Sequence, residues 1–182
     1  MTEKPSRHNS SSALLVIDVQ KEQFEEATPV YKADQLLQNI TLLISKARQE
    51  GVPVFFVQHS ADTYLKFGSE GWQLHPQIQP VAGEPLIFKR HGNSFEDTNL
   101  KEELNKRDVG VVVVTGLVTH GCVKATCLGA LKEGYKVVLV SDAHSNFSKD
   151  APGMIEKWNQ ELSDKGALRS EEHTSELQSR QV

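Results

Sequence analysis

The chain has 182 residues, of which 38% are apolar and 24% charged, and its 20 basic and 24 acidic side chains give a formal net charge of −4. This length supplies one sizeable hydrophobic core and is short for two. Nucleic acids and anionic membranes bind clustered lysine and arginine, so a sequence pI near 6.0 without a basic run argues against both as partners. The longest apolar stretch, Val109–Leu117, is far shorter than the roughly 18 residues that span a bilayer.

Both ends of the chain are polar. Residues 1–12 lack the apolar middle of a secretory signal and predict an N-terminal tail. From Arg169 the chain reads R-S-E-E-H-T-S-E-L-Q-S, which has no apolar periodicity and resembles a translated sequencing-library adapter; the alternative is a natural polar tail. We therefore expect one domain over residues 13–168 and a non-native tail over residues 169–182.

The first half of the chain predicts two strands around one helix. A near-continuous apolar run at 13–19 is typical of a strand that is buried on both faces. Apolar residues at helical spacing then follow Asp34, the expected N-cap, and the helix is expected to end at Gly51. A second strand is expected at 54–57. The segment 58–84 after it has no clear period, and a loop that long in a compact domain is usually functional.

The second half continues the alternation of strands and helices. The elements predicted here are a strand at 85–89, a helix at 99–107, a strand at 109–115, a helix at 119–133, a strand at 136–140 and a helix at 153–165. Such alternation predicts an α/β fold, with a parallel sheet between helices on both faces. Parallel sheets of this kind bind ligands at the carboxyl ends of their strands.

Three chemically active side chains are predicted at that edge of the sheet. The first strand carries Asp18, the third ends in Lys89, and the fourth runs into G-L-V-T-H-G-C, which places Cys122 early in a helix with Thr119 as its expected N-cap. A helix N-terminus and a nearby lysine lower the pKa of a thiol, and a carboxylate accepts its proton. The group therefore predicts a cysteine nucleophile with Asp18 as its base.

Each of these residues also has an ordinary interpretation. A lone cysteine often fills a core, as we expect of Cys127, while Asp18 could cap a turn and Lys89 could end a strand in solvent. The two cysteines lie five residues apart, which on a helix turns them about 140° from each other. No disulfide is therefore expected, and a cytoplasmic location is the simplest expectation.

Phosphate and dinucleotide sites are not predicted. The turn after the first strand reads D-V-Q-K-E-Q-F and lacks the glycines that let a backbone approach a pyrophosphate, and the chain has no G-x-x-x-x-G-K-[ST] loop. A cysteine phosphatase would place an arginine six residues after its nucleophile, whereas Leu128 stands six residues after Cys122.

Four motifs in a fixed order carry a resemblance to a known family. They are V-I-D-V-Q, F-K followed by N-S-F, G-L-V-T-H-G-C-V-K-A-T, and S-D-A-H-S-N-F. From about Leu14 to Ala167 the chain resembles the isochorismatase-like cysteine hydrolases. The resemblance implies a three-layer, Rossmann-like fold with six parallel strands, and a catalytic triad carried by Asp18, Lys89 and Cys122.

The resemblance also implies further features of the site. Members of the family have a cis peptide before the position of Val118, so that the backbone N–H groups of Val118 and Cys122 form an oxyanion hole. The expected activity is hydrolysis of a non-peptide C–N bond in a small amide through a cysteine thioester. An isochorismatase-type vinyl ether hydrolase and a non-catalytic binding protein are the alternatives. A homo-oligomer is expected.

The sequence departs from the metal-binding members of the superfamily. Nicotinamidases carry an Asp-x-His motif after the second strand, whereas this chain reads Q-H-S-A-D, which leaves His59 without its partner and His75 as the only other nearby imidazole. No metal and no cofactor are therefore expected. Candidate residues of the substrate pocket are Phe24, Trp72, Phe95 and His120, and core packing is the alternative for the first three.

The end of the chain departs from the family as well. The resemblance implies a sixth strand at the sheet edge after Gly166 and Ala167, but from Arg169 onwards Leu177 is the only large apolar residue apart from the final Val182. A buried strand needs more apolar residues than this. We therefore expect the final edge strand to be missing, the residues from Arg169 to be disordered or loosely helical, and the strand at 136–140 to have an unpaired edge.

Overall fold

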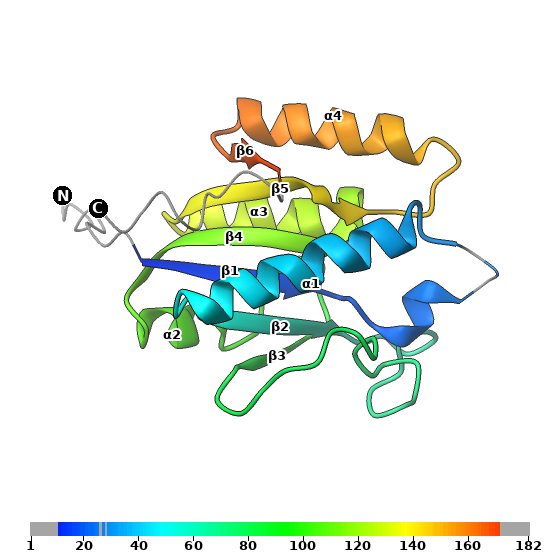
Figure 1. Ribbon diagram of the computed structural model, residues 1–182, viewed down its shortest axis with the longest axis horizontal. Helices are drawn as coiled ribbons and strands as arrows, with labels where there is room; N and C mark the ends of the chain where they lie inside the picture. The colour runs from blue at the N-terminus through cyan, green and yellow to red at the C-terminus, as the bar shows by residue number, and fades with distance from the viewer. Residues whose placement is uncertain (1–10, 26, 28, 172–182) are drawn as a thin grey trace.

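A six-stranded parallel sheet forms the centre of the molecule in a computed structural model, which describes residues 11–25, 27 and 29–171 (Figure 1). The strand order is β3-β2-β1-β4-β5-β6. The strands are β1 (Ser11–Ile17), β2 (Val54–His59), β3 (Leu86–Lys89), β4 (Val109–Leu117), β5 (Lys136–Ser145) and β6 (Leu168–Ser170). The helices are η1 (Lys21–Phe24), α1 (Ala33–Gln49), α2 (Leu100–Asn105), the π-helical turn η2 (Thr119–Val123), α3 (Lys124–Lys132) and α4 (Ala151–Asp164). The predicted α/β class is confirmed.

Helices cover both faces of the sheet, which gives three layers. Side chains of a strand alternate between its faces. Leu14 and Val16 of β1 therefore pack with α1, while Leu15 and Ile17 pack in the second core cluster with residues of α2, α3 and α4. In Figure 1, α1 crosses the near face of the sheet and α3 lies behind it. The strand is buried on both sides, as its apolar run predicts.

The chain reverses its direction of travel across the sheet between β1 and β4. From β1 it adds β2 and β3 on one side, and from β4 it adds β5 and β6 on the other. In such sheets ligands bind where the strand order reverses, outside the carboxyl ends of the strands. The ends of β1 and β4 therefore mark the expected position of a site.

Two helix starts differ from the sequence prediction. Asp34 lies in the first turn of α1, and its N-cap is Lys32, which has a left-handed backbone (φ 49°). The predicted helix 119–133 is divided into η2 and α3, because Gly121 leaves helical geometry with φ −112° and ψ −111°. Thr119 is not an N-cap; that position falls on Val118. Gly51, with φ 69°, ends α1 as expected.

The prediction of a missing edge strand is wrong. β6 pairs in parallel with β5, with Leu168 opposite Val138, Arg169 opposite Leu139 and Ser170 opposite Val140. A strand of three residues needs little apolar surface at an edge: Leu168 is 49% exposed, and backbone pairing supplies the attachment. The expected tail at 169–182 therefore begins inside the sheet, and residues 172–182 lie outside the described residues. The expected N-terminal tail also overlaps β1, which begins at Ser11.

The long loop between β2 and β3 is attached to the sheet by side chains of the β1–η1 region. The amide nitrogen of Gln20 donates to the backbone oxygens of His59 and Trp72, both at 2.9 Å, and Gln20 forms a bridge with Leu74. Glu22 accepts a hydrogen bond from the backbone N–H of Leu65. These contacts hold the loop next to the carboxyl ends of the strands.

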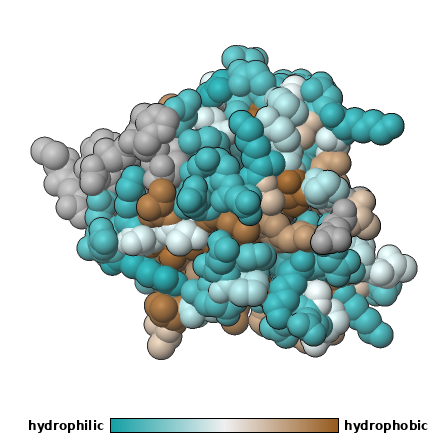
Figure 2. All heavy atoms as spheres, turned by 45° about the vertical axis from the view of Figure 1, so that its right-hand side comes forward, coloured by the Kyte–Doolittle hydropathy of each residue, from teal (hydrophilic) through white to brown (hydrophobic). Residues whose placement is uncertain are grey.

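Hydrophilic residues predominate on the face shown in Figure 2, with smaller apolar patches between them. Large apolar side chains that remain exposed include Leu86 and Phe88 of β3 and Phe67 of the long loop. None of the described helices has the length and apolar character needed to cross a membrane.

Candidate active site

Four neighbouring parallel strands deliver four polar side chains to one edge of the sheet. Asp18 directly follows β1, His59 is the last residue of β2, Lys89 is the last residue of β3, and Cys122 lies in η2 directly after β4. Each predicted triad residue is therefore present at this edge, as the rule for parallel sheets requires. His59 is a fourth member that the triad prediction did not include.

Lys89 lies at the centre of this group. Its Nζ is 3.0 Å from Oδ2 of Asp18, 3.0 Å from Nδ1 of His59 and 3.1 Å from Sγ of Cys122. An ammonium group has three N–H donors, so each of them has one partner. Burial acts to lower the pKa of Lys89, but the charges around it, above all that of Asp18, outweigh this effect and raise the pKa. Lys89 is therefore a fixed cation.

The thiol of Cys122 keeps its proton in this environment. Burial and the charge of Asp18 outweigh the opposing charge of Lys89 and raise the pKa of Cys122 to about 12. The prediction of a lowered pKa is therefore wrong here. That prediction took account of the helix N-terminus and Lys89, but not of the burial of the sulfur or its approach to Asp18.

Asp18 has a free oxygen next to this thiol. Its Oδ2 binds Lys89, and within the described part of the chain its buried Oδ1 has no hydrogen-bond partner. Ligand atoms of Asp18, His59 and Cys122 all lie within 4.8 Å of one another. A carboxylate oxygen without a partner, this close to a thiol, is well placed to receive its proton.

His59 supports the lysine as a neutral acceptor. Because Nδ1 of the ring faces the Lys89 ammonium, this nitrogen carries no proton. Burial and the charge of Lys89 both lower the pKa of His59, which keeps the ring neutral. The sequence did contain the signal for this residue, since His59 occupies the same strand-end position in β2 that Lys89 occupies in β3.

The donor atoms of this cluster do not fit a metal ion while Lys89 is in place. Asp18, His59 and Cys122 are chemically suitable ligands, but the ammonium of Lys89 already lies within hydrogen-bonding distance of all three. His75 does not join them: its ring packs 4.8 Å from that of Phe24. The positive charge of the site is thus supplied by the lysine.

The turn that carries Cys122 starts with an unusual backbone. The peptide bond between Leu117 and Val118 is cis, as the resemblance implied. The carbonyl of Val118 accepts hydrogen bonds from the N–H groups of Gly121 at 3.0 Å and Val123 at 3.3 Å, which close the turn around Cys122.

The predicted pocket residues do not form one group. Phe95 stacks on Tyr135 at 5.6 Å and packs, partly buried, against a core cluster, which agrees with its alternative interpretation. Phe24 packs against the other core cluster. Trp72 contacts Phe88, whose side chain lies on the opposite face of β3 from that of Lys89.

His120 precedes the kink and has a ring nitrogen, Nδ1, without a hydrogen-bond partner within the described residues. Tyr64 of the long loop was not predicted to be in the pocket, but its ring lies 5.9 Å from that of His59. Burial raises the pKa of Tyr64, and the charge of Asp18 acts in the same direction.

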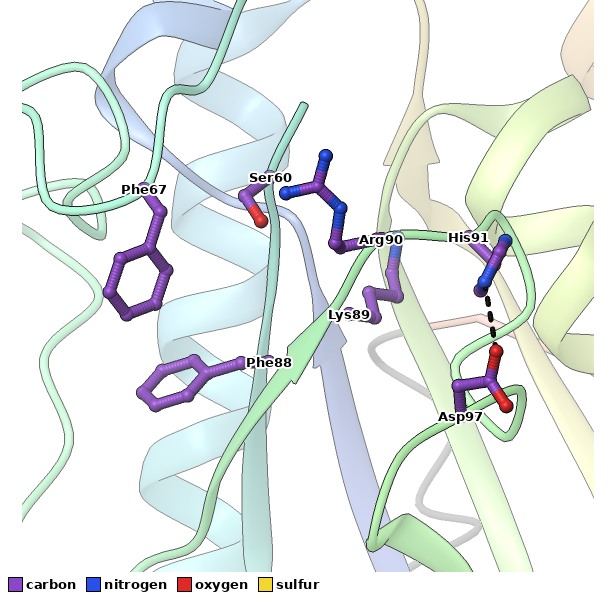
Figure 3. Close-up of a pocket in the computed structure, with 7 residues that line it drawn as sticks. All are labelled: Ser60, Phe67, Phe88, Lys89, Arg90, His91 and Asp97. Carbon is purple, nitrogen blue, oxygen red and sulfur yellow. Dashed lines mark hydrogen bonds and ion pairs between the residues drawn. The ribbon is translucent and has the colours of Figure 1, made fainter. Parts of the chain in front are cut away.

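A hollow of about 390 Å³ lies at the end of β3 (Figure 3). The rings of Phe67 and Phe88 occupy one side, while His91 and Asp97, joined by a contact of 3.1 Å, occupy the other. Its lining is completed by Ser60, Lys89 and Arg90. The space is of the size that binds small molecules.

Comparisons with known proteins agree with this geometry. A family model described as "Isochorismatase domain" matches residues 12–156. The isochorismatase family protein YddQ of Bacillus subtilis (strain 168) is 34% identical over 138 residues, which cover 73% of this chain and 77% of that protein. The streptothricin hydrolase of Streptomyces noursei is 34% identical over 145 residues, which cover 78% of this chain and 58% of that protein.

Solved structures show the same fold. The crystal structure of an isochorismatase from Pseudomonas putida KT2440 superposes with a TM-score of 0.82 at 27% identity, covering 90% of this chain and 89% of the other. The extent of the family match, the identity to YddQ and the shared fold lead to one conclusion: the chain belongs to the isochorismatase family.

Proposed function

We propose that the protein hydrolyses a non-peptide C–N bond of a small amide, with Cys122 as nucleophile, Asp18 as general acid and base, and Lys89 as electrostatic support. The observation that carries the proposal is the contact of one buried ammonium, that of Lys89, with both the carboxylate and the sulfur. A thiol, a base and a fixed cation in mutual contact are the groups that acyl transfer requires.

The first half of the reaction forms a thioester. Asp18 takes the proton of Cys122 when substrate binds, and the thiolate attacks the carbonyl carbon of the amide. The backbone N–H groups of Val118 and Cys122 donate hydrogen bonds to the resulting oxyanion. The C–N bond then breaks, and the amine leaves with the proton held by Asp18.

The second half restores the enzyme. Asp18 accepts a proton from water as that water attacks the thioester carbonyl, and the C–S bond breaks to release a carboxylic acid. The proton then returns from Asp18 to the Cys122 sulfur. Lys89 stays protonated throughout, because its raised pKa keeps it a cation beside the negative charges that move between Asp18 and Cys122.

The activities of relatives support an amide substrate. Besides the streptothricin hydrolase, similar proteins include Nicotinamidase 3 of Arabidopsis thaliana, 28% identical over 165 residues, and the N-carbamoylsarcosine amidase of an Arthrobacter species, 27% identical over 146 residues. Family members are thus hydrolases that include amidases. A small-molecule substrate, a cytoplasmic location and a homo-oligomer are the corresponding predictions for this chain.

Ammonia release from a panel of small primary amides tests the proposal. Cys122→Ala and Asp18→Asn are each expected to lose about a thousandfold or more in kcat, because neither role is filled by a neighbour. Cys127→Ala is the matched control: its sulfur is fully buried in the core, away from the polar cluster, and its turnover should stay within about twofold of the wild type.

Two results would contradict the assignment. Full activity of Cys122→Ala would exclude a cysteine hydrolase and favour the vinyl ether alternative, which needs no thiol. A folded wild-type protein that releases ammonia from no amide and whose Cys122 resists alkylation would favour the non-catalytic alternative.

A further inference from the structure

A buried row of polar side chains lies behind the turn that carries the nucleophile. Oγ1 of Thr119 is 2.9 Å from Nδ1 of His144, and Nε2 of His144 is 2.8 Å from Oδ1 of Asn159. The amide of Asn146 donates to Oγ1 of Thr119 at 3.3 Å, and the amide of Asn159 donates to the backbone oxygen of Ser141 at 3.3 Å. We call Asn146, Thr119, His144 and Asn159 the His144 chain.

The direction of every hydrogen bond in the His144 chain follows from its far end. The backbone oxygen of Ser141 only accepts, so the amide nitrogen of Asn159 faces it and Oδ1 of Asn159 faces the imidazole. Nε2 of His144 therefore carries the proton, and Nδ1 is a bare acceptor. The hydroxyl of Thr119 donates to that acceptor and receives the bond from Asn146.

The four side chains are enclosed by the protein. Thr119 and Asn146 are 0% exposed, Asn159 is 2% exposed and His144 is 3% exposed. Burial lowers the pKa of His144 to about 4, which agrees with the neutral ring that the hydrogen bonds require. A buried polar group that loses its hydrogen-bond partner costs the free energy of its desolvation.

The His144 chain joins three elements at the nucleophile turn. Asn159 comes from α4 and His144 from β5, and both act on Thr119, which is the first residue of η2 and lies between the oxyanion-hole residue Val118 and Cys122. The backbone of this turn sets the direction of its N–H groups. A shift of about 1 Å in such groups costs up to about a hundredfold in rate.

We propose that His144 is a positioning residue: through Thr119 it holds the η2 turn so that the sulfur of Cys122 stays on Lys89 and the turn's N–H groups face the reacting carbonyl. The proposal depends on the proposed function for its kinetic measurement. It assigns a role to the S-D-A-H-S-N-F motif, which supplies His144 and Asn146 and contributes no residue to the triad.

Two isosteric variants each remove one of the two hydrogen bonds made by the His144 ring. In His144→Asn the amide oxygen takes the place of Nδ1 and still accepts from Thr119, whereas the link to Asn159 is lost. In His144→Gln the amide nitrogen takes the place of Nε2 and still donates to Asn159, whereas Thr119 loses its acceptor. Each variant removes one buried bond, so a similar loss of thermal stability is expected for both.

Their kinetics are expected to differ. His144→Asn should retain kcat within about fivefold of the wild type, while His144→Gln should lose about 30- to 100-fold in kcat with KM changed by less than about threefold. Equal kcat values for the two variants, whether both high or both low, would overturn the proposal.

A second measurement needs no turnover. Iodoacetamide labelling with mass spectrometry gives separate alkylation rates for Cys122 and for Cys127, which is buried in the core and reports general opening of the fold. Thr119→Val removes the hydroxyl and should raise the Cys122 rate relative to the Cys127 rate by about tenfold, while Thr119→Ser should match the wild type. An unchanged ratio in Thr119→Val would overturn the proposal even if no amide is hydrolysed.

Discussion

Lys89 determines the chemistry of the site because one ammonium contacts every other member of the cluster. Its three N–H donors are shared among Asp18, His59 and Cys122, so the group has no hydrogen left for a ligand. A divalent cation that took the same three ligands would have to displace a buried, hydrogen-bonded ammonium. Lys89 thus supplies the positive charge that a metal ion would supply at this position.

We predict that hydrolysis does not depend on a metal ion. Treatment with a chelator is expected to change the hydrolysis rate by less than about twofold, because the Lys89 cation occupies the position between the donor atoms. The measurement is the rate before and after dialysis against the chelator, together with elemental analysis of the purified protein. Loss of activity in parallel with loss of bound zinc or iron would contradict the prediction and make His59 a ligand.

The meeting of Asp18, Lys89 and Cys122 at one edge of the sheet was predictable from sequence, but their electrostatics were not. Asp18, Lys89 and Cys122 each follow an apolar run, so the strand-end rule finds them one at a time. The pKa of Cys122 depends on the burial of its sulfur and on its approach to Asp18, which are contacts between residues far apart in the chain. Local helix arguments gave the wrong direction for that reason.

Among the elements, the central strands β1 and β4 leave no room for a side chain at Gly116. At Gly116 of β4 the backbone has φ +119°, and an added Cβ would overlap the backbone of Ile17 in β1. Gly134, which ends the α3 segment at φ +89°, has open space around the position of a Cβ. The two glycines therefore separate the effect of backbone conformation from that of steric overlap.

Substitution of these glycines tests the packing of the strands. Gly134→Ala is expected to lower the free energy of unfolding by about 1 to 2 kcal/mol, the cost of a left-handed backbone. Gly116→Ala adds a clash between paired backbones and should cost more than about 3 kcal/mol or prevent folding. Urea unfolding of both variants gives the comparison. Equal losses of unfolding free energy would show that β1 and β4 move apart to accommodate the added methyl group.

Predictions for whole elements succeeded where apolar pattern decides the structure and failed where caps or pairing decide it. The five strands expected from apolar runs are present. β6, with Leu168 half exposed, has no apolar signal, because its pairing with β5 uses backbone atoms. The start of α1 was misplaced because the sequence favours Asp34 as the N-cap. The actual N-cap is Lys32, whose left-handed backbone the residue types do not reveal.

The stability of the whole molecule should depend on pH on the acid side. His144 has a pKa of about 4 in the fold against an ordinary 6.5, so the unfolded chain binds its proton more readily. Above about pH 6.5 this contribution to stability is complete. As the pH falls to about 4 it is lost, and the free energy of unfolding decreases by about 3 kcal/mol. Urea unfolding between these pH values measures the loss.

The control for this measurement is His144→Asn, in which the side chain at position 144 does not titrate. Its unfolding free energy should fall less steeply with acid than that of the wild type. Parallel curves for the two proteins would mean that other groups account for the pH dependence.

The strand order β3-β2-β1-β4-β5-β6 has a consequence for synthesis on the ribosome. The segments of β1, β2 and β3 are synthesised first. Until β4 emerges, one edge of β1, a strand that is apolar on both faces, has no partner strand. During that interval Asp18 and Lys89 have been made, but the thiol has not. The strand that closes the exposed edge is also the one that leads into Cys122, so in a growing chain the thiol is made only after the strand that covers this apolar edge.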